Sequence, residues 1–206
     1  MFKKLADNYI PDYEIDSFYN ITDDFLKTLK NNGIEAFLLD VDGTITTHYG
    51  TEITEDAKQF LVNAKENFTL AYITNCGFDR SEIVSQKFGE YVDKNVLWPG
   101  KYNNSIWTDW LLKIQNRKPF SQAYLNAAKE LGINIKHCAI IGDEYSTDIL
   151  GAKRAGIRYT IKINNNLSSN EPEKKKLQRK FENWLHRNVI KYTDKRPENI
   201  KDMNFS

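Results

Sequence analysis

Residues 34–44 read IEAFLLDVDGT, an apolar run that stops at a pair of aspartates. The run from Ile34 to Leu39 has the length and composition of a buried strand, and Asp40 and Asp42 stand at its carboxyl end. Because open α/β sheets bind their ligands at the carboxyl ends of their strands, this stretch decides both the fold class and the position of a site. Taken alone it has a second interpretation, a solvated strand-end turn, since Asp-Gly is a common turn pair.

Outward from this stretch, apolar runs of strand length alternate with segments of helical periodicity. That alternation is typical of a parallel sheet with helices on both faces. We predict further strands over 69–73, 91–97, 137–141 and 157–163, and helices beginning after Thr22 and Thr54 and spanning 120–131 and 146–155. The predicted fold is therefore a three-layer, doubly wound, Rossmann-like α/β sheet.

Length and composition predict one domain. The 206 residues divide into an N-terminal arm (1–32), a core (33–163) and a basic amphipathic C-terminal helix (171–191). No apolar run approaches the roughly 20 residues that span a bilayer, and the two cysteines lie far apart in the sequence. We therefore expect a cytoplasmic protein without structural disulfides. The net charge of +1 argues against a nucleic-acid partner.

A second acidic pair changes the interpretation of Asp40 and Asp42. Asp143 ends another predicted strand and Asp148 follows it near the start of a helix, so two strands deliver acids to one edge of the sheet. Four converging carboxylates repel one another unless a cation compensates them. All four are hard oxygen ligands without a nearby His or Cys cluster, which favours Mg²⁺ over Zn²⁺.

Between the two acidic pairs, three further polar residues stand directly after a predicted strand or before a predicted helix. Thr74 and Asn75 follow the strand over 69–73, and Lys118 stands directly before Pro119 and a predicted helix. Gly43 lets the chain turn away after the first acids while its main chain approaches a ligand. Each feature alone fits an ordinary strand end or helix start, but packing does not explain their common order along the chain.

In this order the residues resemble the haloacid dehalogenase (HAD) superfamily of phosphatases. The four matching segments are Asp40-Val41-Asp42-Gly43-Thr44, Thr74-Asn75, Lys118-Pro119, and Gly142-Asp143 with Asp148. The resemblance implies that Asp40 attacks phosphorus to form an aspartyl-phosphate and that Asp42 protonates the leaving oxygen and then activates water. A second carboxyl group beside a nucleophilic one can serve both proton transfers.

The resemblance also implies the roles of the remaining residues. Thr74 and Lys118 would hold the phosphoryl oxygens, with Gly43 and Asn75 also contacting the substrate. The Mg²⁺ ligands would be Asp40, the main-chain carbonyl of Asp42 and Asp143, with Asp148 as an outer orienting acid.

A narrower resemblance, carried by 9–13, 17–21, 118–119 and 142–148, is to subfamily IIIA phosphatases of the YqeG type. That family includes enzymes that dephosphorylate phosphatidylglycerophosphate. The chain has no room for a large cap domain after Thr44, which favours a bulky or membrane-presented substrate. Soluble nucleotide or sugar phosphates and phosphoproteins remain alternative substrates. The non-enzyme alternatives are a receiver-like module, whose acids would precede its Thr and Lys, and a catalytically silent binding module.

Two segments leave alternatives open. The insert before Lys118 carries Trp98, Trp107 and Trp110, and its apolar face either packs on the core or contacts a substrate or a membrane. The C-terminal helix carries apolar residues at helical spacing (Leu177, Phe181, Trp184, Leu185, Val189) among basic ones. It either docks on the sheet or makes a peripheral contact with an anionic membrane. Residues 151–206 hold 14 Lys and Arg against six Asp and Glu.

Two further polar residues lie near the predicted site. Arg80, at the start of a predicted helix after Thr74, is a candidate phosphate contact, and His48 is left without a role.

Overall fold

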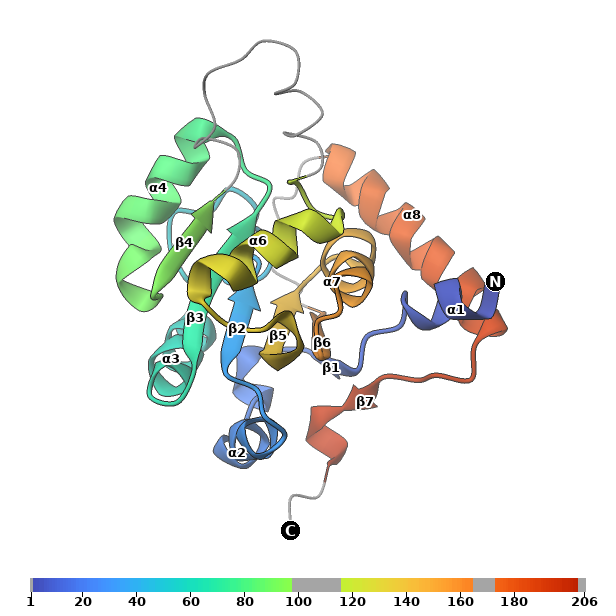
Figure 1. Cartoon of the computed structure of the whole chain (residues 1–206). Helices are drawn as coiled ribbons and strands as arrows, with labels where there is room; N and C mark the ends of the chain where they lie inside the picture. The colour runs from blue at the N-terminus through green and yellow to red at the C-terminus, as the bar shows by residue number, and fades with distance from the viewer. Residues whose placement is uncertain (1, 98–115, 165–172, 204–206) are drawn as a thin grey trace.

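The computed structural model describes residues 2–97, 116–164 and 173–203. Its seven-stranded sheet has the order β4-β3-β2-β5-β6-β1-β7, and every pairing is parallel (Figure 1). The strands are β1 (Tyr13–Ile15), β2 (Ala36–Leu39), β3 (Thr69–Thr74), β4 (Lys94–Leu97), β5 (Cys138–Gly142), β6 (Tyr159–Ile163) and β7 (Glu198–Asn199). The helices are α1 (Phe2–Asp7), α2 (Asp23–Asn31), α3 (Glu55–Lys65), α4 (Phe78–Phe88), α6 (Ser121–Leu131), α7 (Leu150–Ala155) and α8 (Glu173–Val189).

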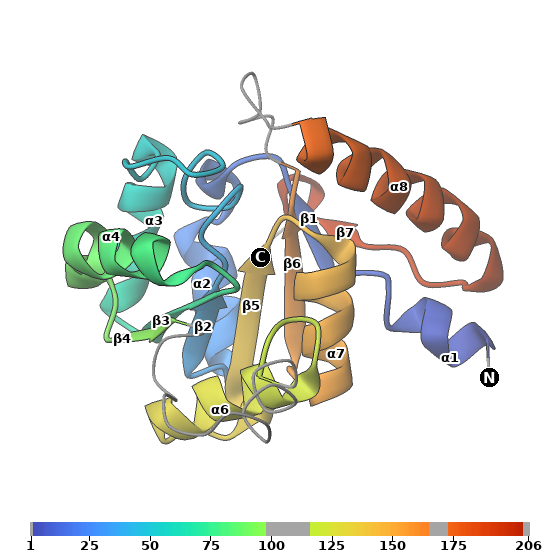
Figure 2. The ribbon, with the colours of Figure 1, turned by 90° about the horizontal axis from the view of Figure 1, so that it is seen from above.

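Strand β2 separates two apolar cores. Phe37 and Leu39 face a core that includes side chains of α2, α3 and α4. Ala36 and Leu38 face a second core formed with α6 and α7. Figure 2 shows α3 and α7 on opposite sides of the strands. Since β2 is buried on both faces, its four residues are all apolar. The predicted three-layer, doubly wound α/β fold is confirmed.

Two predicted elements begin more than two residues later than the sequence predicts. The helix expected over 146–155 is divided into a π-helical turn, Tyr145–Ile149, and α7. The strand expected over 91–97 begins only at Lys94, because Tyr91 closes a 3₁₀ turn that starts at Gly89. Both differences arise where a short turn of non-α geometry joins the strand or helix.

The sheet extends further than the sequence predicts. Strand β1 pairs with β6 on one side and with β7 on the other, so residues from both ends of the chain complete this edge of the sheet. Strand β1 has three residues and β7 has two, too few for an alternating apolar and polar pattern to predict them. The N-terminal segment also contributes Phe18, Phe25 and Leu29 to the core.

The C-terminal helix docks on the domain, but not through its whole predicted apolar stripe. Leu185 and Val189 pack beside Tyr9, Tyr145 and Ile149. The larger part of the stripe is exposed: Leu177, Phe181 and Trp184. No helix in the described segments is long and apolar enough to span a bilayer. The Trp-rich insert, with Trp98, Trp107 and Trp110, lies outside the described residues.

Candidate active site

The register of the sheet brings the first and second acidic pairs together. Leu39 pairs with Ile141 on one side and with Tyr72 on the other. The Asp40 main-chain N–H donates to the Ile141 carbonyl at 3.0 Å. The residues that follow these strands therefore meet at the carboxyl edge, where the chain order reverses between β2 and β5.

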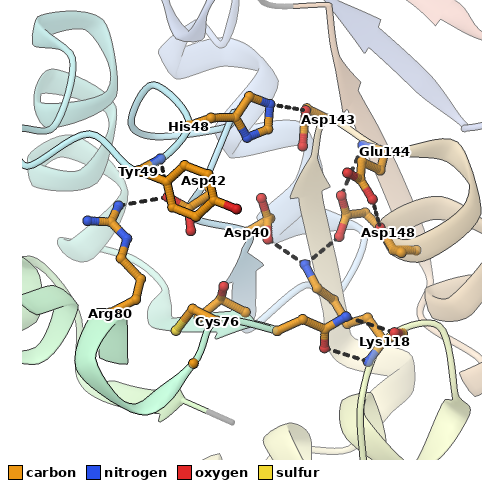
Figure 3. Close-up of a pocket in the computed structure, with 14 residues that line it drawn as sticks. Asp40, Asp42, His48, Tyr49, Cys76, Arg80, Lys118, Asp143, Glu144 and Asp148 are labelled. Atoms are coloured by element: carbon orange, nitrogen blue, oxygen red, sulfur yellow. Dashed lines mark hydrogen bonds and ion pairs between the residues drawn. The ribbon is translucent and has the colours of Figure 1, made fainter. Parts of the chain in front are cut away.

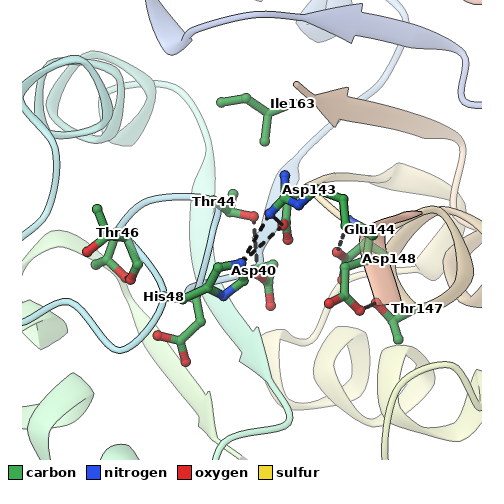
Figure 4. Close-up of polar contacts among 12 residues, drawn as sticks. Asp40, Thr44, Thr46, His48, Asp143, Glu144, Thr147, Asp148 and Ile163 are labelled. Carbon is green, nitrogen blue, oxygen red and sulfur yellow. Dashed lines mark hydrogen bonds and ion pairs between the residues drawn. The ribbon is translucent and has the colours of Figure 1, made fainter. Parts of the chain in front are cut away.

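The loop after β2 depends on Gly43. Its φ is 89°, in the left-handed region. A Cβ built at this position would lie 2.6 Å from Asp143 Oδ2 and 2.8 Å from an atom of the His48 ring. The expectation that Gly43 permits a close turn beside the site is therefore confirmed. Within the same loop, the Thr44 hydroxyl donates to Asp40 Oδ2 at 3.1 Å (Figure 4).

Lys118 lies at the centre of the acids. Its Nζ pairs with Asp40 Oδ1 and, at 2.6 Å, with Asp148 Oδ1, and its side chain is 4% exposed (Figure 3). Burial alone would lower the pKa of Lys118, but Asp148 and Asp40 outweigh burial and raise it well above the ordinary value. Lys118 is therefore a fixed positive charge in this site.

Asn75 holds the segment that carries this lysine. Its side-chain amide donates to the Lys118 carbonyl at 2.8 Å and accepts from the Lys118 N–H at 2.9 Å. Both hydrogen-bonding groups of the amide therefore serve the Lys118 main chain. Thr74, which ends β3, is buried at the same edge.

The carboxylates of Asp40, Asp143 and Asp148 form a buried cluster. One oxygen from each lies within 4.8 Å of the others. Burial and then the neighbouring carboxylates raise the pKa of all three, while Lys118 opposes the shift at Asp40 and Asp148. The net result for Asp148 is a pKa of about 6. A raised carboxyl pKa means that the cluster lacks positive charge for full ionisation. Three hard oxygen donors with this deficit fit a Mg²⁺ ion.

The π-helical turn Tyr145–Ile149 places Asp148 in this cluster. The Asp148 N–H donates to the Glu144 carbonyl at 3.0 Å, and Asp148 Oδ2 accepts from the Glu144 N–H at the same distance. Glu144 also accepts from the Thr147 hydroxyl at 2.9 Å (Figure 4). Gly142 permits the fold-back, because a Cβ there would collide with the Asp148 side chain.

Asp42 is held by Arg80, a residue predicted to contact phosphate. Arg80 Nη2 pairs with Asp42 Oδ1 at 2.7 Å, and the Tyr49 N–H donates to the same oxygen at 3.0 Å (Figure 3). The arginine side chain is 10% exposed. The site thus holds a second buried cation, which orients Asp42.

Two residues beside the acids, Arg179 and His48, were not predicted to act there. Arg179, on α8, lies with Nη2 3.2 Å from His48 Nε2 and 3.5 Å from Asp143 Oδ2. His48 Nε2 itself lies 3.9 Å from Asp143 Oδ2. Because Arg179 is more than 30 residues from Asp143 in the sequence and no motif marks it, only the three-dimensional packing of α8 reveals this contact.

The acids, Lys118 and the polar residues after β3 line a cavity of about 260 Å³. The structure brings together every residue predicted for the site: Asp40, Asp42, Gly43, Thr74, Asn75, Lys118, Asp143 and Asp148. His48, Tyr49, Cys76, Arg80, Glu144 and Thr147 also line the cavity. The arrangement is suited to nucleophilic attack by a carboxylate, with a second acid beside it and fixed cations for an anionic substrate.

Comparisons with known proteins agree with this chemistry. A HAD-hydrolase-like family model matches residues 115–179, the segment that contains Lys118, Asp143 and Asp148. The chain is 22% identical over 157 residues to the probable phosphatase YqeG of Bacillus subtilis (strain 168), and the match covers 76% of each protein. The predicted resemblance to HAD phosphatases, and with it the prediction of an enzyme of phosphatase type, is confirmed.

Solved structures also match part of the chain. An uncharacterized protein from Listeria monocytogenes serotype 4b matches with a TM-score of 0.48 and 23% identity, over 64% of this chain and 79% of that chain. The core domain of a putative phosphoglycolate phosphatase from Streptococcus pneumoniae TIGR4 matches with a TM-score of 0.44 and 21% identity, over 72% of this chain and 96% of that chain.

Proposed function

We propose that this HAD-like phosphatase is a Mg²⁺-dependent phosphomonoester hydrolase that forms an aspartyl-phosphate on Asp40. The observation that carries the proposal is the buried position of Asp40. Its carboxylate pairs with Lys118, and one of its oxygens lies within 4.8 Å of an oxygen of Asp143 and of Asp148, so the three could share a metal ion. A carboxylate held in this way is pre-oriented for attack, and the lysine supplies a charge for the incoming phosphoryl oxygens.

In the first step, an Asp40 oxygen forms a bond to phosphorus and the bond from phosphorus to the ester oxygen breaks. Asp42, in its protonated form, gives its proton to the leaving oxygen. In the second step, Asp42 takes a proton from a water molecule, whose oxygen attacks phosphorus and releases inorganic phosphate and Asp40. The Arg80 guanidinium and the Tyr49 N–H orient Asp42 for both transfers.

Mg²⁺ would be held by Asp40, the main-chain carbonyl of Asp42 and Asp143, and when bound it offsets the charge of the phosphoryl oxygens. Asp148 orients Lys118 through their 2.6 Å ion pair. Thr74 and Lys118 hold phosphoryl oxygens, and Gly43 and Asn75 complete the phosphate pocket. Asn75 does so through its main chain, because its side-chain amide is bonded to the Lys118 main chain.

For the substrate we propose a bulky or membrane-presented phosphomonoester, with phosphatidylglycerophosphate as the first candidate. The support is the short chain between Thr44 and Thr74, which forms α3 and β3 and leaves no large cap over the site at that position. Soluble nucleotide or sugar phosphates and phosphoproteins are the alternative substrates. A panel of phosphatidylglycerophosphate vesicles, nucleotides, sugar phosphates and phosphopeptides ranks them by kcat/KM.

Turnover of para-nitrophenyl phosphate tests the reaction itself. We expect hydrolysis that requires Mg²⁺ and that Asp40→Asn lowers by at least about 10³-fold, because the amide is not a nucleophile. Asp12→Asn is the matched control, since Asp12 also forms an ion pair with a lysine, Lys153, but lies outside the cavity. Turnover without added metal in the presence of EDTA, or equal activity of both variants, would contradict the proposal.

A further inference from the structure

Helix α8 carries an exposed apolar stripe, which we call the outer stripe and define as Leu177, Phe181 and Trp184. Their exposed fractions are 70%, 58% and 55%. The spacing of four and three residues places them on one face of the helix. The Phe181 and Trp184 rings stack with centroids 5.9 Å apart. Contiguous exposed apolar side chains rimmed by polar residues are a feature of protein and membrane interaction surfaces.

Basic residues border this stripe. At 3.6 residues per turn, Lys176, Lys180 and Arg187 fall along one side of it. Lys180 and Arg187 are exposed, while Lys176 pairs with Glu173 at 2.8 Å. The wider C-terminal segment, 151–206, has a net charge of +8.

The opposite face of α8 is already occupied. The His186 ring stacks on the Tyr145 ring with centroids 4.3 Å apart, and Tyr145 stacks in turn on Tyr9 at 5.7 Å. Glu182 is buried and accepts from the Ser146 N–H at 3.1 Å. The helix therefore cannot rotate to bury the outer stripe without breaking these contacts.

We propose that the outer stripe docks the protein on an anionic lipid bilayer. The net charge of +8 over residues 151–206 favours an anionic lipid surface as the partner. Interfacial helices combine Trp, Phe and Leu on one face with Lys and Arg beside it. The side chains of the stripe would enter the boundary between headgroups and acyl chains, while Lys180 and Arg187 contact anionic headgroups.

The position of α8 connects docking to the site. Arg179, on the same helix, contacts Asp143 and His48, which line the cavity. In Figure 2, α8 lies on the side toward which the β5 arrow points, the carboxyl end where the site is built. At 3.6 residues per turn, Arg179 and the outer stripe lie on opposite faces of α8, so a docked α8 would stand between the bilayer and the site. Docking itself does not rest on the proposed function.

Vesicle flotation of the full chain tests the proposal. We expect binding to phosphatidylcholine vesicles that contain 30% phosphatidylglycerol, weak binding to pure phosphatidylcholine, and a decrease with added NaCl. The double change Lys180→Gln and Arg187→Gln should weaken binding by about 25-fold, about fivefold for each charge. Phe181→Ser with Trp184→Ser should lower it at least as much.

The matched control is Tyr19→Ser with Val62→Ser, which removes two apolar side chains of similar exposure, 61% and 58%, from elsewhere on the surface. It should bind vesicles as the unchanged protein does. Circular dichroism of every variant verifies folding.

Three outcomes would overturn the proposal. The first is wild-type binding that does not depend on phosphatidylglycerol, and the second is unchanged binding of the stripe variants. The third is a stripe variant that changes only the oligomeric state in size-exclusion chromatography, which would assign the stripe to a second copy of the chain. Wild-type turnover of para-nitrophenyl phosphate is measured in parallel, so that failure of the proposed function is distinguished from failure of docking.

Discussion

The carboxyl edge of the sheet and the outer stripe of α8 are opposite departures from ordinary burial. At the sheet edge, Asp40, Lys118, Asp143 and Asp148 are ionisable groups removed from water. On α8, large apolar side chains remain in water. Each arrangement costs folding free energy, and each is completed by something outside the chain. The sheet edge lacks positive charge, which a bound metal ion would supply. The outer stripe lacks an apolar partner.

The largest expected effect, apart from loss of the nucleophile, is at the sheet edge. Lys118→Met leaves Asp40 and Asp148 buried without their shared cation, which we expect to cost about 3–5 kcal/mol of unfolding free energy and to abolish turnover. Urea unfolding and para-nitrophenyl phosphate hydrolysis measure the two effects.

Lys153→Met is the matched control for this change. Lys153 forms a 2.8 Å ion pair with Asp12, and its side chain is 8% exposed. The control should lose stability but keep its turnover. Equal turnover of the two variants would mean that Lys118 is only a structural partner of the acids.

The second prediction concerns pH and metal. The pKa of Asp148 is raised to about 6 in the folded protein, and those of Asp40 and Asp143 are raised in the same direction, chiefly by burial. The unfolded chain therefore loses these protons first, so the metal-free protein loses stability as the pH rises from about 4 through about 6. Mg²⁺ binds the ionised carboxylates and opposes this loss.

The expected result is a small Mg²⁺-induced increase in Tm at pH 5 and a larger one at pH 7.5, measured by scanning calorimetry. Phe181→Ser on the outer stripe should leave this pH dependence unchanged, which separates the two regions. A metal effect that is the same at both pH values would contradict the assignment of the acidic cluster as the Mg²⁺ site.

The smallest expected effect is at the junction of the two regions. Glu182 accepts from both the N–H and the hydroxyl of Ser146, in the turn that carries Asp148, and burial raises the pKa of Glu182. Glu182→Ala should cost about 1–3 kcal/mol, because it leaves a buried N–H unsatisfied. Hydrogen exchange should then increase in α8 and in Tyr145–Ile149.

The control for this junction is Glu173→Ala, which removes an exposed acid of the same helix whose pair with Lys176 lies in water. No change in exchange is expected for it. Protection of α8 that stays unchanged in Glu182→Ala would show that the aromatic stack alone anchors the helix.

Much of the site was predictable because its residues adjoin strand ends. Once the apolar run before Asp40 predicts a parallel strand, the residues after each strand must meet at one edge, and the register of Leu39 with Ile141 and Tyr72 shows that they do. The Arg80–Asp42 pair was not predictable, because a helix start does not reveal which oxygen its arginine contacts.

The behaviour of α8 shows a second limit of periodicity. Helical spacing predicted one apolar stripe from Leu177 to Val189, yet only Leu185 and Val189 pack inward. Glu182 and His186 occupy the buried face instead. The Ser146 N–H donates a hydrogen bond to Glu182, and the Tyr145 ring stacks on His186. Such polar docking depends on the partner surface, which a hydrophobic pattern does not encode. The short strands β1 and β7 were missed for lack of length.

The placement of β1 between β6 and β7 also has a consequence for how the protein is made. Tyr13 pairs with Ile161 and with Glu198, residues that leave the ribosome long after it. At synthesis rates of about 5–20 residues per second, β1 waits about 10–40 s for β7. During this time the central strands can assemble, while the β1 edge stays open to pairing with other nascent chains. Chaperone demand should therefore fall only when the last strand emerges.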